Sequence, residues 1–479
     1  MKKSFSIKIG VSGKREIPPE ERDKVYKEIK ASIQNMLRHC KCEDFTGYTA
    51  LAAGADTIFA AVVIEEFRQP LAVVLPFPQE EYEKDFTAEE LAPFRLRLGQ
   101  AANCEVVEAL PSDAGQRNEA YFKAGKTIAD RCDELVIVWD GLRPGGVGGT
   151  AEILGYWAEK NKQYPVAFIK VKALKADLLH EELIRSYRHA NRVAIKARNR
   201  YRRVWKWVIL LGWLTVGCFA VKTAFSLEGD WGRLLTLLEF LFVTAVYSLI
   251  FLARKKDFHG KYLRERMKAE TYRLMRAFYH AGVLIGISDR SREEESSLVE
   301  LAANINRRLA SDATRSGWYT QYVIRCLLAE QCAYHEAKMK SIGNRNQVYE
   351  RINFLIGVLF IVNLAVHLAH LYIIREGVKE MWLYKFSVFF NLLLPASYAA
   401  LEGIIYFNEW SVLKKYSTSA DYSLKEADGL LPTTLDRSSA EENYKIQAQV
   451  LHLVSGIMLT DNRNWNLLLE NKDTYRMIV

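Results

Sequence analysis

Short apolar runs alternate with longer stretches of helical periodicity over the first third of the chain. The strands that this pattern predicts are Phe5–Val11, Tyr48–Ala52, Leu71–Leu75, Cys104–Glu108, Glu134–Trp139 and Val166–Val171. Apolar side chains recur at helical spacing between them, over residues 19–39, 57–67, 117–131 and 150–160. Strands that alternate with helices form a mostly parallel sheet that is covered on both faces. We therefore expect an N-terminal α/β fold with a doubly wound parallel sheet.

Four apolar runs follow, and each is long enough to cross a membrane. They are residues 207–226, 234–253, 354–374 and 384–407. A helix of about 20 residues spans the ~30 Å hydrocarbon core of a bilayer. Buried helices in a large soluble core are the alternative, which the basic residues beside the runs disfavour. The runs therefore predict a C-terminal all-α region with four transmembrane helices in two hairpins.

Charged residues beside the runs predict the orientation of both hairpins. The cations that precede the first run are Arg198, Arg200, Arg202, Arg203 and Lys206. Three more follow the second run at 254–256, whereas the link between the two runs carries Glu228 and Asp230. The second hairpin is flanked by basic residues in the same way. Because basic ends stay on the cytoplasmic side, we expect both termini and the large hydrophilic parts in the cytosol.

Composition excludes a largely disordered chain and argues against nucleic-acid binding. Of the 479 residues, 49% are hydrophobic and 26% are charged, which is ordinary for a folded protein. The net charge is +9, but the basic residues are concentrated in 187–206, where eight occur without an acidic residue. A basic segment directly before an apolar run is typical of a membrane surface. We expect the lipid bilayer as a partner and no direct contact with nucleic acid.

Cysteine usage and the N-terminus place the soluble part in the cytosol. The seven cysteines are odd in number and irregularly spaced, and Cys40-Lys-Cys42 lacks the two-residue gap of a zinc knuckle or thioredoxin motif. We expect seven free thiols in a reducing compartment and no metal site. The first ten residues alternate polar and apolar side chains and lack the apolar core of a signal peptide.

Polar residues inside the apolar runs are candidates for function because exposing them to lipid costs free energy. In the second hairpin, Asn363, His367 and His370 share one helix face at i, i+4 and i+7, and Asn391 and Pro395 lie at similar depth in the returning helix. They have two interpretations, as hydrogen bonds that hold the helices together or as the lining of a pore or gate. In the first hairpin, Lys222 and Glu239 lie at similar outer depth and can form an ion pair.

Glycine-rich turns and polar residues follow three of the predicted strands. They are Gly10, Ser12, Gly13, Lys14, Arg15, Gly54, Asp56, Asp140, Gly141, Gly148, Gly149, Thr150 and Glu152. In open parallel sheets, ligands bind beyond the carboxyl ends of the strands. Glycines let backbone N–H groups approach a phosphate there, and a helix N-terminus adds positive potential. Together with the charges of Lys14 and Arg15, these turns predict a nucleotide-binding site.

Residues 5–171 also resemble the SLOG superfamily, the Rossmann-like fold shared by Smf/DprA and the LOG (lonely guy) proteins. The stretches that carry the resemblance are Ile9–Arg15, Ala50–Asp56, Val74–Pro78, Tyr82, Asp85-Phe86, Asp133–Gly141 and Gly148–Glu152. LOG enzymes cleave the N-glycosidic bond of nucleoside monophosphates. Other SLOG domains, including those fused to membrane segments, are similar to sensors of nucleotide-derived signals. The resemblance therefore implies either a hydrolase or a sensor.

The sequence departs from the LOG motif Pro-Gly-Gly-x-Gly-Thr-x-x-Glu at its acidic residue. An extra Gly149 precedes Thr150, and the acid lies one position early, at Glu152. On a helix this shift rotates the carboxylate by about 100°. A general base must lie within hydrogen-bond reach of the atom that it serves. The departure favours sensing over catalysis, and we assign no catalytic residue.

The membrane part resembles the SLATT type of two-helix effector, which accompanies SLOG and nucleotide-cyclase genes in prokaryotic defence systems. The resemblance rests on Ala269–Arg273 and Phe278–Gly282. The expected domains are a SLOG-like nucleotide-binding domain (1–175), a basic juxtamembrane linker helix (176–206), transmembrane hairpin 1 (207–253), a cytosolic helical region (254–350), transmembrane hairpin 2 (351–407) and a C-terminal cytosolic helical region (408–479).

These resemblances lead to three functional hypotheses. The first is an antiphage effector in the bacterial inner membrane, whose SLOG domain binds a nucleotide second messenger and triggers pore formation by a homo-oligomer. Its expected ligand is a cyclic oligonucleotide or an ADP-ribose derivative, and no cofactor is required. The second is a membrane-tethered nucleotide hydrolase or phosphoribohydrolase that uses Glu152 or Asp56 as its acid/base. The third is a nucleotide-gated ion channel.

Overall fold

A computed structural model divides the chain into two compact units. The residues that the structure describes are 6–111, 113–143, 148–160, 167–173, 177–286, 296–311, 317–373, 382–408, 410–433, 435 and 440–470. Unit 1 comprises Met1–Ile184, Arg273–Leu328 and Ala427–Leu453. Unit 2 comprises Arg185–Tyr272, Ala329–Glu426 and Val454–Val479. Each unit is therefore built from segments that are distant in the sequence.

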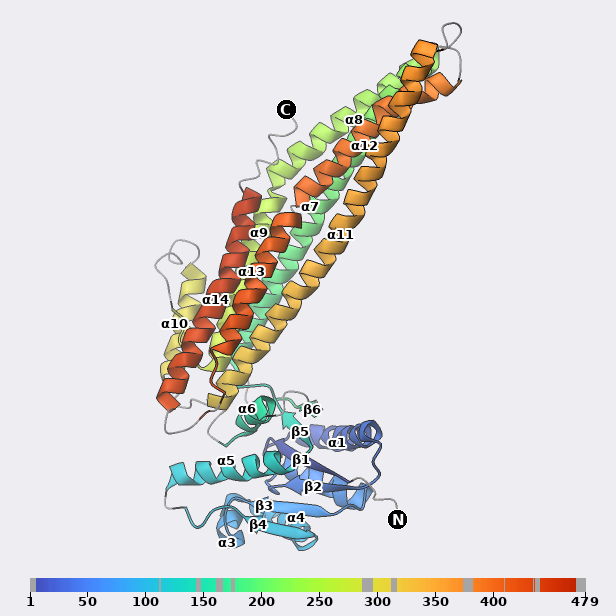
Figure 1. The fold of residues 1–479 in the computed structure, drawn as a ribbon. Helices are drawn as coiled ribbons and strands as arrows, with labels where there is room; N and C mark the ends of the chain where they lie inside the picture. Colours follow the sequence, from blue (N-terminus) through green and yellow to red (C-terminus); the bar gives the residue numbers. More distant parts are fainter. Residues whose placement is uncertain are drawn as a thin grey trace. The chain divides into compact units, whose positions relative to one another are not determined.

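Unit 1 contains a six-stranded parallel sheet (Figure 1). Its strands are β1 (Ile7–Gly13), β2 (Phe45–Thr49), β3 (Leu71–Leu75), β4 (Asn103–Val106), β5 (Glu134–Trp139) and β6 (Ala167–Lys170). Their order is β4-β3-β2-β1-β5-β6, and every neighbouring pair is parallel. The chain moves outward from β1 to β4 and then crosses back to β5. This change of direction creates a topological switch point between β1 and β5, and it confirms the predicted fold class.

Helices cover both faces of the sheet. They are α1 (Pro19–Cys40), α2 (Ala55–Ala61) with a π-helical turn η1 (Val62–Glu66), α3 (Gln79–Tyr82) with a 3-10 turn η2 (Glu83–Asp85), α4 (Ala88–Gly99), α5 (Ala114–Arg131) and α6 (Thr150–Lys160). Alternate side chains of β5 are buried on opposite faces of the sheet. Val136 and Val138 join the hydrophobic core with α1 and α2, whereas Ile137 and Trp139 join the core with α5 and α6.

Two local predictions in this unit were wrong. The second strand ends at Thr49, three residues before the predicted Ala52, because Leu51 has a left-handed backbone conformation (φ 51°) that turns the chain. Helix α4 was not predicted, although Thr87 and Glu90 form a capping box at its N-terminus. In both cases a short-range polar or backbone feature determined the structure, and the apolar pattern did not reveal it.

The remaining helices are long, and several continue from one unit into the other. They are α7 (Leu178–Ala224), α8 (Gly229–Lys256), α9 (Phe258–Ala281), α10 (Ser296–Ser311), α11 (Gly317–Ile373), α12 (Trp382–Asn408), α13 (Trp410–Gly429) and α14 (Ala440–Glu470). Helices α7, α8, α11 and α12 contain segments long and apolar enough to cross a membrane. They hold the four apolar runs, so the structure confirms two helical hairpins. Many of their large apolar side chains are exposed, as lipid contact requires.

Polar side chains within the apolar helices contact one another. Lys222 Nζ lies 3.0 Å from Thr236 Oγ1 and 3.9 Å from a carboxylate oxygen of Glu239, so the expected ion pair between α7 and α8 is present. In the second hairpin, Asn363 Nδ2 donates to Asn391 Oδ1 at 2.8 Å. Such pairs satisfy polar groups that lipid cannot satisfy.

The second polar set also includes two histidines. His367 stacks on Tyr384 with ring centres 5.2 Å apart. His370 lies in α11, but its side chain is outside the described part of the chain. The contacts of Asn363 and His367 with α12 are those expected of interhelical packing, and the pore-lining interpretation stays a prediction.

The first turns of α11 pack directly on the sheet domain within unit 1. The ring of Tyr319 lies 5.5 Å from that of Trp139, and the ring of Trp318 lies 5.1 Å from that of Tyr156. A Cβ atom at Gly155 would lie 2.4 Å from the carbonyl oxygen of Trp318. Only glycine therefore permits this approach of α6 and α11.

We expect Gly155→Ala to destabilise unit 1 by about 1–3 kcal/mol, because the new methyl group collides with backbone. Gly99→Ala is the matched control, since a Cβ at that helical position meets nothing within 4 Å. The measurement is the thermal unfolding midpoint of the full chain in detergent, with tryptophan fluorescence as the readout. Equal midpoints for the two variants would contradict the tight approach.

Candidate functional site

The switch point brings a predicted cation and a predicted carboxylate together. The Lys14 backbone N–H donates to the carbonyl of Val138 at 2.9 Å, which fixes Lys14 at the end of β1. Its side-chain Nζ lies 2.9 Å from Oδ2 of Asp140, directly after β5. Oδ1 of Asp140 accepts the backbone N–H of Leu142 at 3.1 Å. The Asp140 side chain is 8% exposed, so this ion pair is largely screened from water on one side.

The predicted glycines of the first two turns allow close packing. A Cβ at Gly13 would lie 2.2 Å from that of Ala55 at the start of α2. Gly54 has φ +80°, and a Cβ there would lie 2.1 Å from the carbonyl oxygen of Arg15. Gly10 lies inside β1 against α5, and Ser12 pairs with Ile137 of β5. These glycines bring the β1 and β2 turns into contact, which positions Arg15 beside Asp56.

The turn before α6 is held by its own acidic residue. Gly148 has φ +86°, and its N–H donates to Oε2 of Glu152 at 2.8 Å. A Cβ at Gly148 would lie 3.0 Å from the Cβ of Tyr121, so the turn lies against α5. Glu152 is 4% exposed, and Thr150 is also buried. The Glu152 carboxylate therefore has a structural bond at the N-terminus of α6.

Two predicted glycines of the same loop differ in their surroundings. Gly141 has φ +78°, and a Cβ there would meet no atom of the described residues within 4 Å. Gly149 directly precedes α6, and its carbonyl accepts the N–H of Glu152 at 3.0 Å. Residues 144–147, which include two more glycines of the motif, lie outside the described residues.

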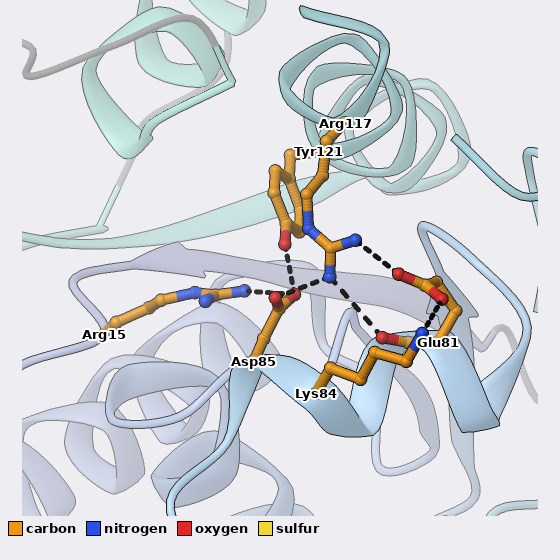
Figure 2. A network of polar contacts seen from close by, with 6 residues as sticks. All are labelled: Arg15, Glu81, Lys84, Asp85, Arg117 and Tyr121. Atoms are coloured by element: carbon orange, nitrogen blue, oxygen red, sulfur yellow. Dashed lines mark hydrogen bonds and ion pairs between the residues drawn. The ribbon is translucent and has the colours of Figure 1, made fainter. Parts of the chain in front are cut away.

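Arg15 belongs to a polar network that extends from β1 to α5 (Figure 2). Its guanidinium lies 3.7 Å from Oδ2 of Asp85 and 5.1 Å from the ring centre of Tyr121. Asp85 also accepts from Arg117 at 2.6 Å and from the hydroxyl of Tyr121. Arg117 donates in addition to Glu81 at 2.7 Å. One carboxylate thus contacts two guanidinium groups and a phenol from two further elements.

Buried aromatic rings pack against Arg117 and Tyr121 of this network. Phe77 and Tyr82 are 0% and 1% exposed, and their ring centres lie 6.5 Å apart. The guanidinium of Arg117 lies 4.7 Å from the ring centre of Phe77, which in turn lies 5.4 Å from that of Tyr121. Cation–π contacts of this kind fix the orientation of a guanidinium. The arginines are therefore held in place by aromatic packing as well as by carboxylates.

Burial raises the pKa of two groups near Arg15, Asp56 and Tyr121. Asp56 is 4% exposed, and burial raises its pKa to about 7, although its Oδ2 accepts from Thr49 Oγ1 at 3.1 Å and from the Ala50 N–H at 3.2 Å. Burial and then the hydrogen bond to Asp85 raise the pKa of Tyr121. Near pH 7, Asp56 is therefore partly neutral, and the Tyr121 hydroxyl remains a donor.

The site contains residues that sequence reasoning missed. Arg117 and Tyr121 lie on the predicted helix 117–131, and their i, i+4 spacing places them on one face. That spacing was visible in the sequence, but nothing indicated that this face meets the end of β1. Asp85 was noted only for its part in the resemblance. The sequence thus identified the residues at the edge of the sheet and missed Asp85, Arg117 and Tyr121, which contact them.

Comparison of the chain with models of known protein families and with curated proteins finds no match. Among the described residues, no group of three or more His, Cys, Asp and Glu side chains is arranged to hold a metal ion. The switch point holds two adjacent cations, each paired with a carboxylate, Lys14 with Asp140 and Arg15 with Asp85.

Stability should depend on pH through Asp56. Its folded pKa of about 7 lies above the ordinary value of about 3.9, so the folded protein binds this proton more tightly than the unfolded chain. The free energy of unfolding should therefore fall as the pH rises from about 4 to 7. We expect the unfolding midpoint of Asp56→Asn to fall less over this range, because the amide keeps an acceptor and has no proton to lose.

The exposed carboxylate of Asp44 offers a matched control, since Asp44→Asn should reproduce the wild-type profile. The measurement is the unfolding midpoint of each full-length protein at pH 5, 6, 7 and 8. Parallel profiles for wild type and Asp56→Asn would exclude this role for Asp56.

Proposed function

We propose that this protein is a membrane effector that senses a nucleotide-derived signal in the cytosol. The observation that carries the proposal is the pair of cations at the switch point, Lys14 against Asp140 and Arg15 against Asp85. Parallel sheets bind ligands at this position, and phosphate groups favour Lys and Arg. A phosphorylated ligand would bind by taking the place of the two carboxylates.

The ligand class follows from the charge and shape of this edge. Two cations on adjacent residues suit a ligand with more than one phosphate, such as a cyclic oligonucleotide or an ADP-ribose derivative. The partly buried ring of Tyr121 beside Arg15 offers a surface on which a base can stack. No cofactor is needed for such recognition.

The contact between α6 and α11 supports a route from this site to the membrane helices. The Gly148 turn lies against Tyr121, which contacts Arg15, and α6 packs on Trp318 through Tyr156. Helix α11 is continuous from Gly317 to Ile373 and includes the third apolar run. A ligand that displaces α6 would therefore act on α11 directly.

A second set of contacts joins three helices at the same place in unit 1. The hydroxyl of Tyr319 lies 3.1 Å from Nδ1 of His280, and Nε2 of His280 lies 2.8 Å from Nδ1 of His180. Burial, followed by the proximity of His180, lowers the pKa of His280 to about 3, so this imidazole stays neutral. His180 lies in the first turn of α7, and His280 lies in the last turn of α9. These turns and the first turn of α11 thus meet within unit 1.

The proposed response is a leak through the bacterial inner membrane, formed by a homo-oligomer during antiphage defence. The resemblance to SLOG and SLATT proteins suggests this setting, and the flanking charges suggest cytoplasmic termini. The ligand must bind the open state more tightly than the closed state, because only differential affinity shifts the equilibrium. A ligand that changes the packing of α6 on α11 meets this requirement.

A leak assay on the full chain tests the proposal. We expect liposomes that carry the protein to release a trapped dye when cyclic oligonucleotides or ADP-ribose derivatives are added, with the ligand recovered intact by chromatography. Lys14→Gln should weaken the response by roughly tenfold or more, because it removes a charge-assisted contact. Lys27→Gln, an exposed lysine on α1, should respond like wild type. Absence of a leak with every compound would refute the effector role.

Packing on α6 should be needed for the response and dispensable for binding. We expect Trp318→Ala to keep the ligand affinity within about threefold while it reduces dye release, because the substitution removes the ring contact with Tyr156. Calorimetry on the same preparation gives the affinity and controls for folding. An unchanged leak in this variant would contradict the route through α11.

One observation favours a hydrolase as the alternative. The pKa of about 7 for Asp56 is close to that of an effective general acid or base at neutral pH. Glu152 is less suited, since its carboxylate is bonded to the Gly148 N–H. Release of free base or ribose phosphate by the full chain, lost in Asp56→Asn, would establish the enzyme and demote the hairpins to an anchor.

A further inference from the structure

The Asp85 carboxylate occupies a position that resembles the binding site of an anion. One oxygen accepts from Arg117 at 2.6 Å, and the other accepts from the Tyr121 hydroxyl and lies 3.7 Å from Arg15. Two guanidinium groups and a phenol around one oxyanion are the donors that proteins use for phosphoryl groups. Asp85 comes from the turn after α3, whereas its donors come from β1 and α5 (Figure 2).

We propose that Arg15, Arg117 and Tyr121 form a second anion subsite, which Asp85 fills until a phosphoryl group of the ligand replaces it. This subsite is distinct from the one at Lys14, whose carboxylate partner is Asp140. The identity of its ligand as a nucleotide rests on the proposed function.

The donors are held in place without Asp85, as a binding subsite requires. Arg117 is bonded to Glu81 at 2.7 Å and lies over Phe77 at 4.7 Å. Arg15 lies over the ring of Tyr121 at 5.1 Å. Donors that are fixed beforehand lose little conformational freedom when an anion binds. The cluster in Figure 2 has three cations and two carboxylates, so it carries one net positive charge even with Asp85 in place.

The two subsites together select the class of ligand. Lys14 and Arg15 are adjacent, but their partners follow different strands, Asp140 after β5 and Asp85 after β3. The Gly148 turn lies against Tyr121 of the second subsite, whereas Lys14 and Asp140 form the first of the two subsites. A ligand that occupies both must carry two acidic groups. A diphosphate-bridged nucleotide or a cyclic oligonucleotide meets this condition, and a nucleoside monophosphate does not.

The competing explanation for the same contacts is that Asp85 only stabilises the fold. In that case Asp85 joins the turn after α3 to α5, and its removal would loosen the site and weaken any anion binding. The two explanations predict opposite signs. If Asp85 competes with the ligand, loss of its charge strengthens anion binding.

Inorganic pyrophosphate is the probe, and calorimetry on the full chain in detergent is the measurement. We expect Asp85→Asn to bind pyrophosphate roughly tenfold more tightly than wild type, because one charged competitor is gone. Adding Arg117→Gln to this variant should reverse the gain. Glu83→Gln is the matched control, since Glu83 lies in the same turn but bonds to Arg95 and Gln79. Its affinity should stay within about twofold of wild type.

Unchanged or weaker binding of pyrophosphate to Asp85→Asn would overturn the second subsite. The proposed function is tested separately by titrating ADP-ribose and cyclic dinucleotides into the same proteins. If nucleotides bind and Asp85→Asn has no effect, the subsite is refuted and the sensor stands. If pyrophosphate binding tightens and no nucleotide binds, the subsite stands and the nucleotide assignment fails.

Discussion

The pairing of two adjacent cations with two different carboxylates organises the whole edge of the sheet. Lys14 and Arg15 follow β1, where the side chains of the two carboxylates beside them are only 8% and 14% exposed. Each therefore has a carboxylate partner, Asp140 from the β5 turn and Asp85 from the turn after β3. Unpaired charges in such a place cost free energy, and paired ones define which loops must meet there. In the proposed function, an anionic ligand would replace the carboxylates of these same two ion pairs.

Within unit 1, helix α6 lies between the turn at Gly148 and the first turns of α11. The turn before α6 closes on its own Glu152, and the far side of α6 contacts α11 through a glycine that leaves no room for a side chain. Helices α7 and α11 each join a polar segment of unit 1 to an apolar run without a break. The described contacts therefore link the turn before α6 with the first turns of α11 within unit 1.

The sequence allowed the sheet to be predicted because its central strands are continuous apolar runs, as at Leu71–Leu75, and alternate with periodic helices. The ion pair of Lys222 with Glu239 was also predictable, since equal depth in a hairpin leaves each charge one natural partner. The lengths of the long helices were harder to predict. The basic linker and the first apolar run have different compositions, and no residue between them indicates that both belong to one helix, α7. The Arg117–Asp85 contact could not be predicted from the sequence, because it depends on which face of α5 meets the end of β1.

A cryo-electron-microscopy map of the full chain in a lipid nanodisc would show directly whether a ligand replaces the two carboxylates. The chain would be loaded with the tightest binder among ADP-ribose and the cyclic dinucleotides. We expect ligand phosphate at Lys14 and Arg15, with Asp140 and Asp85 displaced from these cations and α6 shifted on α11. A ligand bound elsewhere, with both ion pairs intact, would contradict this expectation.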